Sequence, residues 1–220
     1  MEQLKAALVA GSYESAAVGP DLRAVLESAM PVYRRHYWPD HDRANRAWIA
    51  ANSNRMKQIA PDVIARLERL YGVEWFASPV RADVVWVANR EGAYTTNGPP
   101  PHAVISIETT DWATIEIVFH EFSHVLVLPL ERRLESSLGD RIRDHRTLWH
   151  AIQFYLTGAA VQGALKARGI TYTPFSTDLF SRAWPQYRRP VEANWEPYVR
   201  GQIGLDDAIG GTVQMLQGVQ

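Results

Sequence analysis

The sequence predicts a single α+β domain, residues 1–220, that is mostly helical and carries a small mixed sheet. Apolar side chains recur at helical spacing through much of residues 1–79 and 177–216, so both parts are expected to be helical. Between residues 80 and 110 the pattern changes to that of strands. The order of helices, strands and helices is typical of an α+β arrangement, and no linker is long enough to separate two domains.

The N-terminal part is expected to contain several helices. Residues 21–30 have helical spacing, and residues 42–71 are interpreted as a helical pair. Pro61 and Asp62 are expected to start the second helix of this pair, because proline is favoured in the first turn of a helix. Gly72 is expected to end it.

Two strands are expected in the middle of the chain. Residues 80–88 are rich in β-branched and aromatic side chains, which favour strands. Residues 89–101 contain many turn-forming residues and are interpreted as a connection. Residues 102–109 form the second predicted strand, which we expect to be an exposed edge of the sheet.

Two strong helical segments follow the strands. Residues 112–128 have helical periodicity, and Pro129 is expected to end this helix. A further helix is predicted over residues 145–168, with Asp144 as its N-cap and Gly169 at its C-terminal end.

Composition and charge exclude several classes of function. The chain has 23 basic and 24 acidic residues and a net charge of -1, which excludes a strongly basic protein that holds nucleic acid by bulk electrostatics. It has no cysteine, so a disulfide framework, an iron–sulfur cluster and a thiolate zinc site are all impossible. Any metal must therefore be held by His, Asp or Glu side chains.

The sequence leaves the cellular compartment open. No apolar run approaches the roughly 18–20 residues of a membrane span, so none is expected. Residues 1–17 include a short apolar patch, but they have Glu2 and no cationic region of a signal peptide. A bacterial periplasmic or secreted location is expected if a signal peptide has been removed, and a cytoplasmic one otherwise. The oligomeric state is equally open.

The most informative segment, residues 115–127, contains an H-E-x-x-H motif formed by His120, Glu121 and His124. Residues four apart on a helix differ by about 40° in projection, so the two imidazoles point the same way, as two ligands of one zinc ion require. Glu121 lies next to the metal, where its carboxylate can take a proton from a water molecule. The apolar side chains lie opposite, so the histidines are expected to face a cleft. The alternative is that they are surface histidines without a metal.

A catalytic zinc ion needs a third protein ligand and one open position. The nearby candidates are Glu131, Glu135, Asp144, His145 and His150. His150 is favoured for two reasons. It projects away from the apolar stripe of its predicted helix, and it lies far enough after His124 for a loop and a returning antiparallel helix. Trp149 and Phe154 are expected to form a dry wall around the site. The two glutamates are the main alternatives.

The segment IVFHEFSHVL resembles the active-site helix of the zincin metallopeptidases. The strand HAVISIET before it resembles the zincin edge strand, which pairs with an extended substrate. The helix containing LWHAIQFYLTG is similar to one in uncharacterised bacterial zincin-like proteins. The resemblance covers about residues 80–168 and implies a zincin-like active-site helix that follows an edge strand.

Within the zincins, a third ligand on a second helix resembles the gluzincin layout. Gluzincins use Glu there, whereas this chain offers His150, and Phe154 stands where they have a supporting Asp. The metzincin pattern is excluded, because Val127 and Leu130 occupy the positions of its Gly and third His.

These features imply a zinc-dependent hydrolase, most simply a metallopeptidase that acts on a peptide or protein. Zn²⁺ is expected on His120, His124 and His150, with Glu121 as the general base. Two alternatives remain open. One is an inactive zincin-like binding protein whose structural zinc has a fourth protein ligand. The other is a zinc amide or ester hydrolase that holds a small molecule in a closed pocket.

Zincins often add a side chain that stabilises the oxyanion. Five tyrosines are available, and no spacing rule selects among them: Tyr94, Tyr155, Tyr172, Tyr187 and Tyr198. Tyr187, Arg188 and Arg189 form an aromatic–basic cluster that belongs either to a surface loop or to the cleft. His102 opens the second predicted strand and is a further candidate for the cleft.

Overall fold

The structure is a computed structural model, and it describes residues 19–75, 80–90, 92–96, 101–107 and 111–217. The chain divides into two compact units, Met1–Arg46 and Ala47–Gln220. The second unit contains the sheet and the H-E-x-x-H motif. The mostly helical chain with its small sheet confirms the predicted α+β class.

The first unit contains α2 (Pro20–His36) and the beginning of α3 (Trp38–Tyr71). The predicted helical pair over residues 42–71 is wrong, because α3 continues through Pro61. Ile59, Val63 and Leu67 of α3 are fully buried on both sides of this proline, so core packing offsets the backbone hydrogen bond that proline removes. Gly72 follows the helix with a positive φ of 63°, as predicted for a helix end.

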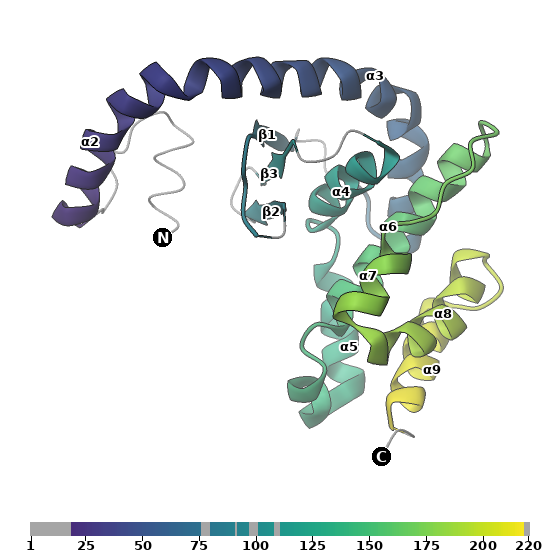
Figure 1. Ribbon diagram of the computed structural model, residues 1–220. Coiled ribbons are helices and arrows are strands. Elements are labelled where there is room, and N and C mark those ends of the chain that lie inside the picture. Colours follow the sequence, from purple (N-terminus) through teal and green to yellow (C-terminus); the bar gives the residue numbers. More distant parts are fainter. Residues whose placement is uncertain (1–18, 76–79, 91, 97–100, 108–110, 218–220) are drawn as a thin grey trace. The chain divides into compact units, whose positions relative to one another are not determined.

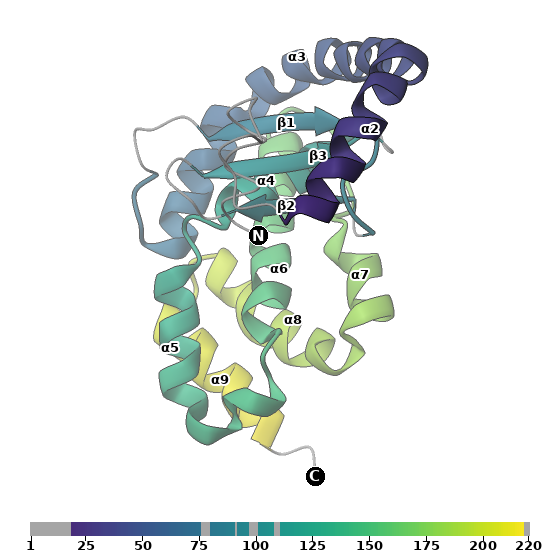
Figure 2. The ribbon, with the colours of Figure 1, turned by 90° about the vertical axis from the view of Figure 1, so that its left-hand side faces the viewer.

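The sheet has three strands, β1 (Arg81–Val85), β2 (Ala93–Thr96) and β3 (His102–Ser106). Their order is β1-β3-β2, with β1 parallel and β2 antiparallel to β3, which confirms the small mixed sheet (Figure 2). The prediction that residues 102–109 form an exposed edge is wrong: β3 is the central strand and all five of its residues are buried. The segment predicted as a connection contains β2, which pairs with β3 on the side opposite to β1. Residues 108–109 of the predicted strand lie outside the described residues.

Helix α4 (Trp112–Ser123) packs between the sheet and α6 (Leu148–Lys166), with contacts to β2, β3 and α6 (Figure 1). Asp111 caps α4 by accepting hydrogen bonds from two backbone N–H groups of its first turn. Apolar side chains of α4 pack on the inner face of β3, and others join the main core with α6. Helix α6 is buried on almost all sides, so its apolar stripe is much wider than the sequence pattern indicates.

Both helices are shorter than predicted. Helix α4 ends at Ser123 instead of residue 128, and Pro129 lies in the first turn of the next helix, α5 (Leu128–Leu138), where proline is tolerated. A short 3₁₀ helix, η1 (Gly139–Asp144), leads from α5 to α6. Helix α6 begins at Leu148, and Asp144 does not cap it. The predicted helix end at Gly169 is confirmed by the positive φ of this residue, 73°.

Three helices complete the second unit, in the part of the chain predicted to be helical: α7 (Ser176–Ala183), α8 (Pro185–Val199) and α9 (Leu205–Gln217). Helices α8 and α9 pack side by side (Figure 1). Trp195 of α8 is fully buried and donates a hydrogen bond from Nε1 to Thr212 of α9. Within the described part of the chain, no single helix combines the length and apolar composition of a membrane span; only α4 and the Leu128–Asp144 segment, taken together across a 74° bend, meet both conditions.

Candidate metal centre

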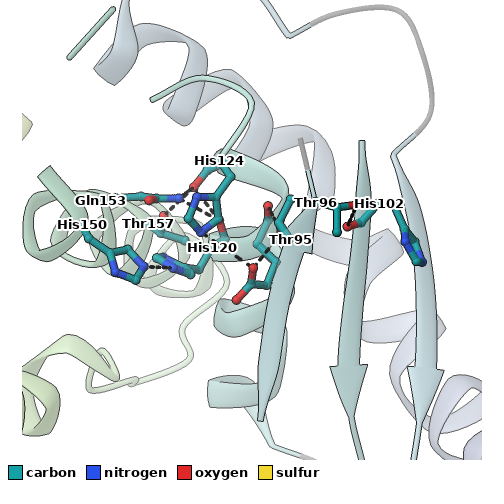
Figure 3. Close-up of polar contacts among 10 residues, drawn as sticks. Thr95, Thr96, His102, His120, His124, His150, Gln153 and Thr157 are labelled. Atoms are coloured by element: carbon teal, nitrogen blue, oxygen red, sulfur yellow. Dashed lines mark hydrogen bonds and ion pairs between the residues drawn. The ribbon is translucent and has the colours of Figure 1, made fainter. Parts of the chain in front are cut away.

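Three histidines from two helices converge in the second unit (Figure 3). His120 lies in the last turn of α4, His124 is the C-cap of that helix, and His150 lies in the first turn of α6. One ring nitrogen of each lies within 4.8 Å of the other two. Among the described residues, no other group of three His, Asp or Glu side chains is arranged to hold a metal. The structure thus brings together the three side chains expected to be ligands.

The geometry and charge of this group fit a zinc ion. The Nε2 atoms of His120 and His150 are 3.0 Å apart, close to the separation of about 3.3 Å that two tetrahedral Zn–N bonds of about 2.0 Å produce. Burial lowers the pKa of His124 and of His150 to about 4, and it holds the pKa of His120 well below its usual value. All three imidazoles are therefore neutral at pH 7, which is the form that binds a metal.

Aromatic rings enclose the histidines. The ring of Phe154 stacks on that of His120, with 3.5 Å between the centroids and an interplanar angle of 15°. Trp149 stacks on His150 and meets His124 edge-on, as expected from the sequence. Trp184, which precedes α8, adds a third ring beside His150. Because Nδ1 of His120 is buried without a hydrogen-bond partner in the described residues, stacking on Phe154 orients this ring.

Glu121 lies next to the three histidines without belonging to their group. Its Oε2 atom is 3.7 Å from Nε2 of His124 and 2.6 Å from the hydroxyl of Thr95. Burial raises the pKa of Glu121 to about 7, and the hydrogen bond from Thr95 opposes that rise. A carboxylate with a pKa near neutrality can both take and return a proton.

The strand beside the site is β2, at the edge of the sheet. Thr95 of β2 contacts Glu121. His102 of β3 bonds to Asp83 of β1 and lies away from the histidines (Figure 3). In the described residues, β2 pairs only with β3. The edge strand expected near the site therefore exists, but it is β2 and not the strand that immediately precedes α4.

A cleft of about 590 Å³ opens over the histidines. It is walled by β2 and the residues before it, by α4 and α6, and by α7 with the turn that follows it. The side chains that line it on the α7 side are Phe175, Leu179, Arg182, Ala183 and Trp184. The histidines of α4 line this cleft, as the helical pattern predicted, although His120 is only 1% exposed where α6 packs against α4.

The alternative ligands lie elsewhere. Glu131 and Glu135 line a separate hollow with Arg146, between α5 and the start of α6. His145 follows η1, and its ring lies beside that of Tyr187. Asp144 ends η1 and is exposed. None of these four belongs to the histidine group.

Of the five candidate tyrosines, Tyr94 lines the cleft. Tyr172 donates a hydrogen bond to Glu116, and Tyr198 donates one to the carbonyl of Leu70. Tyr187 is buried in the core and Tyr155 lines another hollow, beside α8. Arg188 and Arg189 are exposed on α8, a helix and not a loop, and they do not line the cleft.

Sequence reasoning missed three residues that contact the site: Thr95, Gln153 and Trp184. Thr95 lies in a segment predicted to be a turn, so nothing in its pattern marked it. Gln153 is a polar residue inside a strongly apolar helix, and this was a usable signal. Trp184 reaches the site through the α7–α8 connection, which no local pattern reveals.

Comparisons of the chain with protein-family models, with curated proteins and with solved structures find no match. The function is therefore inferred from the residues of the site and their arrangement.

Proposed function

We propose that the protein is a zinc metallopeptidase. The observation that carries this proposal is the convergence of three neutral, buried imidazoles beside the Glu121 carboxylate, at a cleft bordered by a sheet edge. Three histidine ligands with one open position are typical of catalytic zinc.

His120, His124 and His150 would hold the ion. When bound, zinc polarises the scissile carbonyl and makes a water molecule more acidic. Glu121 accepts the proton of the attacking water and then delivers it to the leaving amine. The hydrogen bond from Thr95 holds the Glu121 carboxylate beside the site, where its Oε2 atom is 3.7 Å from Nε2 of His124. Phe154, Trp149 and the other rings limit access of bulk water to the histidines.

The peptide part of the proposal is supported by β2. An extended chain can add to a free sheet edge through backbone hydrogen bonds, and its side chains then alternate between the two faces. Ala93, Tyr94 and Thr95 of β2 line the same cleft as the histidines. A peptide paired with β2 would therefore pass over Glu121.

A structural zinc site is disfavoured by the ligand set. Such a site has four protein ligands, but the described residues supply three, and Glu131 and Glu135 line a different hollow. The small-molecule hydrolase stays a second candidate for one reason: about 590 Å³ is within the range of small-ligand pockets.

The test combines metal content with activity. The purified chain should contain about one zinc ion after reconstitution, as measured by elemental analysis. It should cleave fluorogenic peptides of eight to ten residues faster than dipeptide amides or simple esters. Glu121→Gln should abolish cleavage and retain zinc. Absence of bound zinc in the wild-type protein would refute the proposal, and faster cleavage of the small esters would favour the second candidate.

A further inference from the structure

A buried polar network joins α4 to α6 beside the histidines. The side-chain amide of Gln153 donates hydrogen bonds from Nε2 to the His120 carbonyl and to Oγ of Ser123, both at 3.0 Å. The Ser123 hydroxyl donates to the same carbonyl at 2.8 Å and lies 3.3 Å from the hydroxyl of Thr157. Gln153, Ser123 and Thr157 are completely buried, and Figure 3 shows Gln153 and Thr157 directed toward the turn that carries His120 and His124.

The network lies at the C-terminal end of α4, where backbone carbonyls no longer have a helical N–H partner. In a continuing helix, the carbonyl of His120 would accept from the N–H of His124. Here the His124 N–H is directed to the carbonyl of Glu121 at 3.4 Å, because the chain leaves the helix at this residue. The His120 carbonyl thus needs other donors, and Gln153 and Ser123 provide them.

We propose that Gln153 is a positioning residue of the metal centre. Its amide holds the last turn of α4, which carries His120 and His124, against α6, which carries His150 less than one turn from Gln153. The distance between the two halves of the ligand set is therefore set by this side chain. The inference rests on the proposed zinc site.

The cost of keeping Gln153 supports this role. Its Oε1 atom is buried without a hydrogen-bond partner in the described residues, and an unsatisfied buried polar atom destabilises a fold. An apolar side chain would avoid that cost but would remove a donor from the His120 carbonyl. Gln153 supplies two donors at a point where both are used.

The test is the zinc affinity of the full-length chain, measured by competition with a chromogenic chelator, together with the absorption spectrum of the Co²⁺-substituted protein. Gln153→Met keeps the length of the side chain and removes both donors. Gln162→Met is the matched control, because Gln162 is also on α6 and also donates to a backbone carbonyl, that of Tyr172, away from the cleft. Leu156→Ala, at a fully buried apolar position of α6, controls for lost stability.

Gln153→Met should bind zinc at least about tenfold more weakly than wild type, as supporting residues of metal sites do when removed, and its Co²⁺ spectrum should change. Both controls should match wild type in affinity and spectrum. Ser123→Ala leaves the Gln153 donor in place, so it should weaken zinc binding less than Gln153→Met does. It replaces Gln153→Met as the test if that variant does not fold.

Three results would overturn the inference. The first is a Gln153→Met variant that binds zinc as tightly as wild type. The second applies if Gln153→Met does not fold, and is a Ser123→Ala variant with wild-type zinc affinity. The third is a Leu156→Ala variant that loses as much zinc affinity as Gln153→Met does. If the wild-type chain binds no zinc, the proposed function fails as well, which distinguishes the two failures.

Discussion

The hydroxyl of Thr95 donates a 2.6 Å hydrogen bond to the carboxylate of Glu121 and thereby ties the edge strand β2 to the C-terminal turn of α4. The same hydroxyl lies 2.9 Å from the backbone carbonyl of Glu121. A substrate that adds to β2 would therefore meet a carboxylate whose position depends on that strand.

Replacing Thr95 should lower the rate of peptide cleavage without loss of zinc. Thr95→Val keeps the shape and removes the hydroxyl, so the carboxylate of Glu121 loses its donor. We expect kcat to fall by about tenfold, which corresponds to roughly 1.4 kcal/mol for a hydrogen bond to a charged group. Thr95→Ser should restore most of the rate. Steady-state kinetics and zinc analysis measure both, and equal rates in all three proteins would exclude the role of Thr95.

The third ligand can be identified by alanine substitution. His150→Ala should weaken zinc binding by orders of magnitude, because two histidines alone are a poor site. Glu135→Ala and Glu131→Ala should bind zinc as wild type does, since both side chains lie in a separate hollow. Chelator competition gives the three affinities, and a loss confined to either glutamate variant would show that the histidine group is not the site.

Removing the metal should destabilise the second unit. The ion would join α4 to α6, and zinc at about 100 times its Kd adds roughly 2.7 kcal/mol to the folded state. For a chain of this length, this corresponds to a rise of about 5–10 °C in Tm. Differential scanning calorimetry with and without chelator measures the change. His150→Ala should show little response to chelation, and a wild-type Tm that chelator leaves unchanged contradicts the prediction.

Glu116 should make stability depend on pH. This carboxyl group is fully buried on α4 and accepts hydrogen bonds from the Tyr172 hydroxyl and the Phe175 N–H. Burial raises its pKa from 4.5 to about 7, although those hydrogen bonds oppose the rise. Between these two values the folded state holds a proton that the unfolded state has lost. Its contribution to stability is therefore present below about pH 4.5 and is lost as the pH rises through 7.

Glu116→Gln keeps an acceptor for both donors and removes the titration. Relative to wild type, the variant should gain stability between pH 5 and pH 8, by up to about 3 kcal/mol. Urea unfolding at the two pH values measures the difference. Glu27→Gln, at an exposed position of α2, should show no such gain. An equal difference between variant and wild type at pH 5 and pH 8 would mean that Glu116 does not titrate in this range.

The comparison between sequence and structure is clearest at the sheet and at α3. Residues 102–106 were correctly predicted as a strand from their alternating pattern. They were not predicted as the central strand of the sheet, because an alternating pattern does not show how many neighbours a strand has. Pro61 was taken as a helix start, whereas the buried stripe of Ile59, Val63 and Leu67 continues through it. In both cases packing against other segments outweighed a local preference.

Within the site, local spacing along one helix was enough to bring His120 and His124 together with Glu121 beside them, because helix geometry relates residues one turn apart in the same way in every protein. Helical phase also made His150 available as a ligand. Its contact with His120 arises from tertiary packing alone, as do the contacts that Thr95 and Gln153 make with α4 across 26 and 33 residues. Many arrangements of the same helices and strands satisfy the local preferences equally well. The one observed is selected by burying α4 between the sheet and α6 while giving the His120 carbonyl a donor, and neither requirement is visible in a pattern along the chain.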